Sequence, residues 1–594
     1  MLKSILEFFS LLTPDQRKRF FILQILLIIM TVAEVVSIFS ITPFMAIVGD
    51  PSILQRENFL SMLYLKSNLD EPYEFIFYLG LVVLTILTIS AFISIFITWR
   101  LAMFATKIGV EIGDSLYSHY LNQDWLFHTK ENSSNLTKKI ANEATRLTTE
   151  FILPLMYVNA RFFLTLLIVL MLFLYDPIIL IISLIVFSSA YIIIFKLARR
   201  RLETNSKDIS DMFSERFKLM NEGFGGIKEV LLLDRSDFFK KRFIKTGKKL
   251  SNGLGVNRAV ALIPRYFMEL VGFASMVILV IYLISNYKGN LGLIMPILSI
   301  YAIAGVKLLP ALQQIYNGIA TAKGNLSAYE SIREDLINIK TVTVQKVEAN
   351  QQVWSKNNEI SLKNITFNYP EKKTIALKNI SLVIKPNTTV GFVGTSGSGK
   401  STLIDVIIGL IKPQQGEILI DGIPLIKKNL RAWQNKIGIV PQTIFLTEGT
   451  IVENVAFGIP DDLINHEQVK KALKLAHLEE WVLELENGIY SKVGERGIQL
   501  SGGQRQRIGI ARALYYEADV LVFDEATSAL DGITEKAIIN AIHDLTGKKT
   551  VIMIAHKLGI LKKCDQIFLM NKGSIVDSGN YQQLLEKNEE FKKM

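Results

Sequence analysis

The chain has 594 residues, half of them apolar, and a formal net charge of +11. Its mean hydropathy of +0.31 excludes an ordinary soluble protein, which would need a more polar surface at this size. The positive charge does not indicate nucleic-acid binding, because Lys and Arg cluster in particular loops beside apolar segments, as in oriented membrane proteins. The single cysteine, Cys564, excludes an intramolecular disulfide framework and is expected to be an inert thiol in a reducing cytoplasm.

Six apolar segments precede residue 325, and each is close to the ~20 residues that a helix needs to cross a bilayer. This pattern predicts an α-helical domain with six membrane spans. The first segment is too long for a cleavable signal peptide and lacks a small-residue cleavage site. The expected cores of the spans are Phe20–Ser40, Phe75–Trp99, Phe151–Tyr175, Ile178–Phe195, Ala259–Ile284 and Leu291–Leu312.

Basic residues mark the side of the membrane on which each connection lies. The connection Lys196–Arg258 between the fourth and fifth spans holds roughly sixteen Lys and Arg residues, and that between the second and third about six. The opposite connections hold few, and Asp50–Glu74 is mostly acidic. This asymmetry predicts that both termini are cytoplasmic.

The two basic connections are long, so spans two to five are expected to continue as helices beyond the bilayer and to turn there. The expected turning points are Asp124–Asn135, which contains Trp125 and Phe127, and Glu222–Val230, which contains Phe224. These turns can contact a cytoplasmic domain. The alternative is an ordinary solvated loop.

A helical extension, Gly324–Lys340, and a polar linker, Thr341–Asn358, are expected to follow the last span. We assign residues 1–335 to the transmembrane domain, 336–358 to the linker and 359–594 to a second domain. The second domain opens with ISLKNITFNYP, whose alternation of apolar and polar residues predicts a half-buried strand.

A glycine-rich tract, GTSGSGKST, lies between the buried strand Val390–Val393 and the helix Ser401–Leu410. It is a P-loop, in which backbone N–H groups surround phosphates, Lys400 reaches the β- and γ-phosphates and the Ser401 hydroxyl ligates Mg²⁺. The N-terminus of the helix faces the phosphates. The second domain is therefore predicted to bind ATP with Mg²⁺. The tract consists of Gly394, Thr395, Ser396, Gly397, Ser398, Gly399, Lys400, Ser401 and Thr402.

Two further motifs lie on the C-terminal side of the P-loop. The strand VLVFDE ends in Asp524, expected to hold Mg²⁺ through water, and Glu525, expected to orient or deprotonate the attacking water. Shortly before it stands LSGGQ, which includes Ser501, Gly502, Gly503 and Gln504.

The P-loop, LSGGQ and VLVFDE in this order resemble the ATP-binding cassette (ABC) family. Behind six spans they resemble a half-transporter of the exporter type, with an α-helical transmembrane domain fused to an α/β P-loop nucleotide-binding domain. The turning points of the long helices would then be the coupling helices of such exporters. VGERG, ahead of LSGGQ, matches an exporter segment and disfavours an importer.

The resemblance implies roles for four more residues. Gln442, in IVPQ, would reach Mg²⁺ and the attacking water, and His556, in VIMIAH, would contact the γ-phosphate. Tyr369 would stack on adenine, and Asp531, in SALD, would line the dimer interface. The alternatives are a surface turn for Gln442, a structural histidine at a strand end for His556 and a core aromatic for Tyr369.

The resemblance also implies a dimer. In the family, LSGGQ completes the ATP site of a second copy, so Ser501, Gly502 and Gly503 would serve the partner. One chain holds one P-loop, one LSGGQ and six spans without an internal repeat. Since the site residues are all present, a homodimer with two equal sites is expected.

Charged residues within the spans bear on the cargo, because such residues usually face a wet cavity or a partner. Arg100, Arg265 and Lys307 come from three different spans and would form a basic wall suited to an anionic cargo such as a pyrophosphate. The alternative for Arg265 is a neutralising pair with Glu269, four residues further on.

A closer resemblance rests on Glu34 with SIFSITPF, on IPRYFMELVGF and on VKLLPAL. These segments are similar to the lipid-linked oligosaccharide flippase of bacterial N-glycosylation and its O-antigen relatives. That flippase has arginine where this chain has Lys307, which keeps the charge but loses bidentate phosphate binding. Residues Gln55–Asn68 could form the external helix that this flippase carries, or a plain interfacial anchor.

The sequence therefore predicts an ATP-driven homodimeric flippase of polyprenyl-pyrophosphate-linked oligosaccharides in a bacterial inner membrane. Its partners would be a second copy, membrane lipid and the glycolipid, and no nucleic acid. The alternative is an exporter of another amphiphile: a peptide, a drug or a lipid A-like lipid. A non-transporting scaffold would be expected to lack Glu525 or His556, and both are present.

Overall fold

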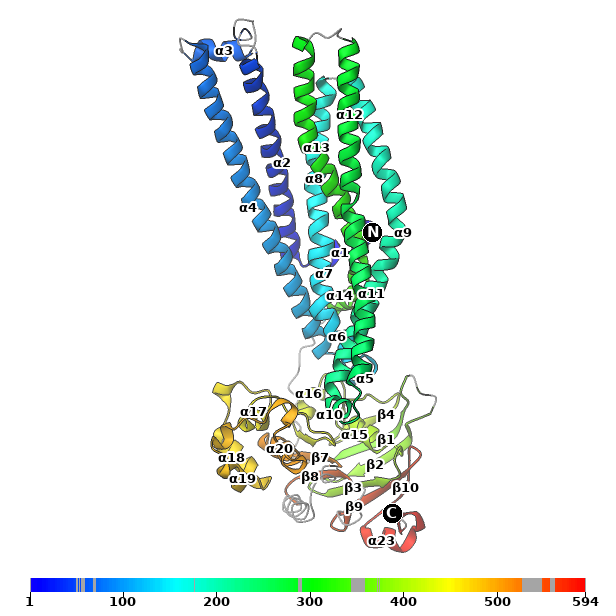
Figure 1. The fold of residues 1–594 in the computed structure, drawn as a ribbon. Helices are drawn as coiled ribbons and strands as arrows, with labels where there is room; N and C mark the ends of the chain where they lie inside the picture. Colours follow the sequence, from blue (N-terminus) through cyan, green and yellow to red (C-terminus); the bar gives the residue numbers. More distant parts are fainter. Residues whose placement is uncertain are drawn as a thin grey trace. The chain divides into compact units, whose positions relative to one another are not determined.

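The computed structural model (Figure 1) describes residues 2–49, 52, 54, 59–67, 71–175, 177–286, 291–342, 358–370, 372, 374–525, 547–555 and 561–592. The chain divides into two compact units. The first comprises Met1–Gln123 and Phe127–Gln345, and the second Asp124–Leu126 and Lys346–Met594.

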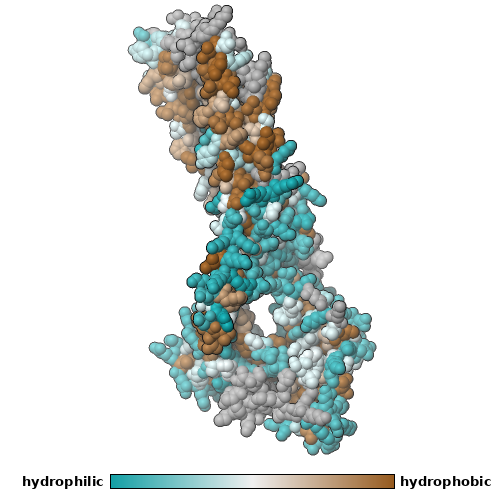
Figure 2. Space-filling model, turned by 45° about the vertical axis from the view of Figure 1, so that its right-hand side comes forward, coloured by the Kyte–Doolittle hydropathy of each residue, from teal (hydrophilic) through white to brown (hydrophobic). Residues whose placement is uncertain are grey.

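The first unit consists of long helices that run side by side (Figure 1). By length and composition, four stretches of its described residues could cross a membrane: Pro14–Met45, Pro72–Leu121, Ser133–Leu170 and Ser236–Ser285. Brown, apolar surface covers one end of this unit in Figure 2, and teal, polar surface covers the other. The helices that carry most of the predicted spans are α2 (Pro14–Gly49), α4 (Pro72–Leu121), α8 (Leu153–Tyr175), α9 (Pro177–Gly225), α12 (Pro264–Asn286) and α13 (Leu291–Gly324). The third predicted span begins before α8, in the π-helical residues Leu147–Ile152, and the fifth begins before α12, in α11 (Ser236–Leu262).

Shorter helices connect these spans. α5 (Trp125–Lys130) and α10 (Ile227–Leu232) stand at the two expected turning points. α3 (Phe59–Lys66) forms within the segment expected to be an external helix, and the rest of that segment, apart from Ser67, lies outside the described residues. The other helices are α1 (Leu2–Leu11), α6 (Ser133–Lys138), α7 (Ala144–Arg146), α11 (Ser236–Leu262) and α14 (Leu326–Val342).

The helix α14 crosses the domain boundary drawn at residue 335 and ends at Val342, two residues beyond the helical extension expected to reach Lys340. Leu336 and Ile339 are partly buried against the core of the helical unit, which holds this last part of the helix in place. In that core, the fully buried rings of Phe151 and Tyr329 stack with centroids 6.3 Å apart.

The second unit is built on two sheets. The smaller is antiparallel and has the order β2 (Leu377–Ile384), β1 (Ile360–Phe367), β4 (Gln415–Ile420), β5 (Ile423–Pro424). The larger has the order β10 (Ser574–Gly579), β9 (Gln566–Asn571), β3 (Thr389–Gly394), β8 (Thr550–Ile554), β7 (Val520–Asp524), β6 (Ile437–Val440).

Helices flank these sheets. Those of the second unit are α15 (Lys400–Ile407), α16 (Leu430–Gln434), α17 (Ile451–Val455), α18 (His466–Leu475), α19 (Glu479–Glu484), α20 (Gly502–Tyr515), α23 (Tyr581–Lys587) and α24 (Glu589–Lys592). The predicted fold class is confirmed: a helical transmembrane domain is joined to an α/β P-loop domain.

The parallel strands of the larger sheet bring the motifs together. β3, β8, β7 and β6 are neighbours and run parallel. The P-loop follows β3, Asp524 ends β7 and Gln442 follows β6. Because the carboxyl ends of parallel strands meet at one edge, these residues share the edge at which ligands bind in open α/β sheets.

Candidate nucleotide site and membrane cavity

Glycines shape the loop between β3 and α15. Gly399, at the N-cap of α15, has φ +101°, and a Cβ there would lie 2.7 Å from the carbonyl oxygen of Ala376. A Cβ on Gly394 would lie 2.1 Å from the carbonyl oxygen of Met570. Both positions therefore require glycine, which lets the backbone turn tightly in front of the helix N-terminus.

The Lys400 ammonium lies inside this loop. Its Nζ donates to the carbonyl oxygens of Gly394 at 2.9 Å and Thr395 at 3.0 Å, and to Ser398 Oγ at 3.4 Å. Burial lowers the pKa of Lys400, while the Glu525 and Asp524 carboxylates oppose that shift. The cation is thus already held where phosphate oxygens could replace the carbonyl oxygens.

Gln442 and Glu525 are in direct contact. Gln442 Nε2 donates to Glu525 Oε2 at 2.8 Å. Glu525 has φ +51°, a left-handed backbone that is uncommon outside glycine and costs free energy for other residues. The structure thus joins two residues that stand 83 positions apart in the sequence.

The remaining groups at this edge fit a magnesium site. Among the described residues, no group of three or more His, Cys, Asp or Glu side chains could hold a metal ion. Mg²⁺ needs no such group, because it usually binds one or two protein oxygens together with substrate phosphates and water. The exposed Ser401 hydroxyl and the partly exposed Asp524 carboxylate supply such oxygens.

The LSGGQ sequence begins α20. Ser501 is the N-cap, and its hydroxyl and the Gln504 side chain form a capping box, with Oγ accepting from Gln504 N at 3.2 Å. Ser501 is exposed, and Gly502 and Gly503 in the first turn are partly exposed. An open helix N-terminus of this kind can bind an anion.

Tyr369 lies beside the P-loop helix. Its hydroxyl is 3.3 Å from Thr402 Oγ1 and its ring packs edge to face on Phe367, with centroids 5.1 Å apart. The partly exposed ring leaves room for stacking. His556 and Asp531, both expected to serve the ATP site, lie outside the described residues.

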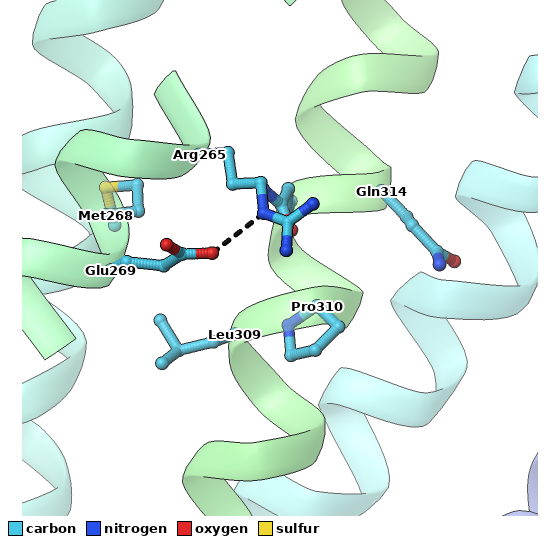
Figure 3. A pocket seen from close by; sticks show the side chains of 7 residues that line it. Arg265, Met268, Glu269, Leu309, Pro310 and Gln314 are labelled. Atoms are coloured by element: carbon cyan, nitrogen blue, oxygen red, sulfur yellow. Dashed lines mark hydrogen bonds and ion pairs between the residues drawn. The ribbon is translucent and has the colours of Figure 1, made fainter. Parts of the chain in front are cut away.

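The helical unit contains a cavity of about 260 Å³ between α12 and α13. Figure 3 shows Arg265 and Glu269 on one wall, joined by the Nε–Oε1 contact of 2.7 Å, opposite Leu309 and Pro310. The side chains of Arg265 and Glu269 are 56% and 41% exposed, so the pair is open to a ligand. The lining residues are Arg265, Met268, Glu269, Leu309, Pro310, Gln313 and Gln314.

A second ion pair adjoins this cavity through Gln314. Arg161 Nη1 pairs with Glu34 Oε2 at 2.8 Å, and Arg161 Nε donates to Gln314 Oε1 at 2.6 Å. The side chains of Arg161 and Glu34 are only 21% and 14% exposed. Glu34 was identified from the sequence, but Arg161 was not. Arg161 could have been found as well, because it is a charged residue within the third predicted span, and such residues usually face a cavity or a partner.

Of the three residues expected to form a basic wall, one lies at this cavity. Arg265 lines it, whereas Arg100 and Lys307 are not among its lining residues. Both side chains are exposed, and the Arg100 guanidinium carbon lies 5.8 Å from the centroid of the Phe96 ring. The pairing of Arg265 with Glu269, which was the alternative to the basic wall, is the arrangement observed.

Two family profiles match the chain. The ABC transporter transmembrane region matches residues 20–252, and the ABC transporter family matches residues 377–528. A structure of a bacterial Atm1-family ABC exporter with ATP bound has a TM-score of 0.80 at 19% identity and covers 97% of both chains. At this identity the likeness shows the fold.

Curated relatives are ATP-dependent lipid A-core flippases. The one from Methylobacillus flagellatus is 30% identical over 403 residues, 66% of each chain. The one from Escherichia coli K12 is 28% identical over 557 residues and covers 92% of this chain and 94% of its own. The relative from Pectobacterium atrosepticum is also 28% identical, over 89% of this chain and 90% of its own.

Proposed function

The chain is an ABC exporter half-transporter that hydrolyses ATP and flips a lipid-type substrate. We propose that this substrate carries a phosphorylated head group. We also propose that the working unit is a homodimer. The observation that carries the cargo proposal is the cavity with two neighbouring arginine–carboxylate pairs among apolar helices. Guanidinium groups bind phosphate oxygens with two parallel hydrogen bonds.

The ATP site combines residues at one edge of the larger sheet with Tyr369, which follows β1 of the smaller sheet. Lys400 exchanges its loop carbonyl partners for the β- and γ-phosphate oxygens, and Tyr369 stacks on the adenine. Mg²⁺, held by Ser401 and Asp524, would neutralise charge on the phosphates. Glu525 positions the attacking water and accepts its proton, and Gln442 holds that carboxylate in place until the water arrives.

The second half of each ATP site comes from the partner chain. Half-transporters of this family function as dimers, and the exposed first turn of α20, with Ser501 as its N-cap, offers backbone N–H groups to a γ-phosphate. His556 and Asp531 would complete the site at the γ-phosphate and at the dimer interface. Two identical chains then give two equal sites.

Cargo recognition depends on competition for the arginines. A phosphate entering the cavity can replace Glu269 as the partner of Arg265, while Met268 and Leu309 contact the apolar part of the lipid. The curated relatives favour a lipid A-like cargo. Arg100 and Lys307 would contact the head group at another stage of its passage.

A polyprenyl-pyrophosphate-linked oligosaccharide is the second candidate. The helix α3, Phe59–Lys66, favours it, because it forms in the loop where the oligosaccharide flippase carries an external helix. Met62 and Leu65 on α3 are 56% and 76% exposed and could meet a lipid tail. In either case both termini would face the cytoplasm of a bacterial inner membrane.

Two measurements test the cargo: mass spectrometry of lipids that co-purify with the protein, and stimulation of the ATPase by lipids added to nanodiscs. Lipid A is expected to be the co-purified lipid, and added lipid A is expected to raise ATP hydrolysis. A bound polyprenyl-pyrophosphate glycan, with stimulation by that lipid alone, would decide for the second candidate. A bound peptide or an uncharged lipid would overturn the phosphate proposal.

A further inference from the structure

The polar part of the helical unit contains a carboxylate with no exposed surface. Glu143 Oε1 accepts from Ser210 Oγ at 2.9 Å and lies 3.5 Å from Lys138 Nζ. Glu143 Oε2 lies 2.9 Å from Arg146 Nη1. The side chains of Glu143, Lys138 and Arg146 are 0%, 5% and 9% exposed, so the charges are neutralised inside the protein.

This cluster, here named the stem network, joins three parts of the chain. Its cationic members also bind the neighbouring helices: Lys138 Nζ donates to Ser214 Oγ at 2.8 Å, and Arg146 Nη2 donates to Asn325 Oδ1 at 3.0 Å. Ser210 and Ser214 belong to α9, and Asn325 stands between α13 and α14. The stem network consists of Lys138, Glu143, Arg146, Ser210, Ser214 and Asn325.

A second contact fastens α9 to α14. Ser206 Oγ donates to Ser327 Oγ at 2.9 Å, and Ser327 Oγ donates to the Ser206 carbonyl oxygen at 2.6 Å. Both side chains are buried. The helices are therefore joined by direct hydrogen bonds as well as by the stem network.

The helix that carries Glu143 has an unusual backbone. Lys139–Glu143 and Leu147–Ile152 are π-helical, a rare form that appears mostly as single turns inside α-helices and frequently at functional sites. Lys138 and Glu143 are five residues apart and would lie about 140° apart around a regular α-helix with 3.6 residues per turn. A wide turn brings residues five apart together, so the ion pair and the π-helical register support each other.

Opening the stem network would be costly. A buried ion pair adds little net stability, but separating its members leaves an uncompensated charge, which is strongly destabilising. Helices held in this way therefore tend to move together. α14 is the element whose chain continues toward the ATP-binding unit, so a displacement of α14 would be passed to α9 and to the third span.

We propose that Glu143 is a positioning residue that makes the polar ends of the third, fourth and sixth spans one rigid body through the transport cycle. This body passes the displacement caused by ATP hydrolysis to the cavity-lining helices. Glu143 acts through the helices it joins and touches neither nucleotide nor cargo.

A reversible crosslink tests the rigid body without knowledge of the cargo. The double variant Ser206→Cys with Ser327→Cys replaces two touching hydroxyls by thiols, and the native Cys564 is buried. After oxidation, verified by mass spectrometry of the linked peptide, ATP hydrolysis in nanodiscs should remain within twofold of the reduced sample. Loss of turnover on oxidation and recovery on reduction would show that α9 and α14 separate, and would overturn the proposal.

A charge-neutral variant tests Glu143 itself. Glu143→Gln keeps the shape of the side chain but removes the carboxylate that Lys138 and Arg146 share, so cargo moved per ATP should fall about tenfold, within the usual range of coupling energies. Basal ATP hydrolysis by the folded protein should be retained. Glu215→Gln, which removes a partly exposed pair with Arg242, is the matched control and should change neither the cargo moved per ATP nor basal ATP hydrolysis.

The two experiments combine into a rescue. Oxidised cysteines at positions 206 and 327 should restore part of the cargo moved per ATP in Glu143→Gln, since the crosslink holds α9 to α14 even though the bond from Glu143 to Ser210 on α9 is weakened. If folded Glu143→Gln moves as much cargo per ATP as the wild type, the proposal is overturned. The cargo readout rests on the proposed function, whereas the crosslink readout does not, so a wrong cargo class would leave the crosslink result standing.

Discussion

At the scale of single residues, the ATP site is defined by hydrogen bonds that hold its charged groups before nucleotide arrives. Lys400 is bound to carbonyl oxygens of its own loop, and the Glu525 carboxylate is bound to Gln442. The backbone of Glu525 is left-handed, and such strain persists only where the surroundings enforce it. These restraints imply that the reactive carboxylate is positioned rather than free.

Replacing Glu525 by Gln should leave ATP binding intact and slow hydrolysis by about 10²–10⁴-fold, the usual contribution of a positioned general base. Steady-state ATPase and nucleotide-binding measurements check this. Glu517→Gln is the matched control, because Glu517 shares the same φ of +51° but pairs with Lys471. Hydrolysis by Glu525→Gln near the wild-type rate would remove Glu525 from the mechanism.

Asp405, on α15, is expected to make the stability of the folded protein depend on pH. Burial, reinforced by the Asp524 carboxylate, raises the pKa of Asp405 to about 6. Because the folded state holds this proton more tightly than the unfolded state, the resulting stabilisation is full below the unfolded value near 3.8 and is lost as pH rises through about 6.

Thermal unfolding of the nucleotide-free and Mg²⁺-free protein between about pH 4 and pH 7 checks this expectation, because the two pKa values of Asp405 bracket the fall in stability. The wild type should lose stability with rising pH up to about pH 6 relative to Asp405→Asn, which has no proton to lose, and the two curves should run parallel above it. Curves that are parallel over the whole window would show that Asp405 does not titrate there.

At the scale of elements, the close approach of α8 and α13 depends on Gly318. A Cβ at this position would lie 2.5 Å from Val158 Cγ2 and 2.9 Å from the Pro154 carbonyl oxygen. Because the carbonyl belongs to the backbone, it cannot move aside without displacing the helix. The third and sixth spans therefore touch through their backbones.

The substitution Gly318→Leu should lower the melting temperature and the yield of folded protein, by roughly the 1–3 kcal/mol expected for overpacking. Gly305→Leu is the matched control on the same helix, because a Cβ there meets nothing within 4 Å. Equal melting temperatures for the two variants would contradict the tight α8–α13 contact.

The ion pair on α12 is an element-scale test of cargo recognition. Arg265→Ala should retain basal ATPase activity and folding but abolish lipid transport, and Arg265→Lys should retain part of it through charge alone. Transport into the outer leaflet of proteoliposomes measures the effect. If Glu269→Ala reproduces every defect of Arg265→Ala, the pair is structural and the cargo proposal fails.

At the scale of the whole molecule, one chain holds half of each expected ATP site. The P-loop follows β3, whereas Ser501 caps α20, and the expected dimer places Ser501 opposite the partner's P-loop. Mixed dimers of Lys400→Ala and Ser501→Arg chains should then contain at most one intact site, and each parent homodimer should hydrolyse ATP poorly.

Co-expressed chains with two affinity tags allow the mixed dimer to be purified and its ATPase rate compared with both parents. About half of the wild-type rate is the upper limit expected if the two sites act independently. Full activity of the Ser501→Arg homodimer would refute the shared site.

The sequence by itself determined the architecture, the chemistry of the ATP-binding domain and the membrane helices. These follow from local signals: apolar runs of sufficient length, and motifs such as GTSGSGKST and LSGGQ whose residues act through the backbone beside them. The sequence also predicted that Cys564 is an inert thiol, and the structure agrees, since the thiol is buried and burial raises its pKa to about 12.

Only the tertiary structure decided which distant residues meet. Arg161 with Glu34, Gln442 with Glu525, and Glu143 with Ser210 stand 127, 83 and 67 positions apart. The sequence also did not indicate the π-helical turns around Arg146. Such pairings arise when helices pack and strands align, and the burial that gives them their energy exists only in the folded chain.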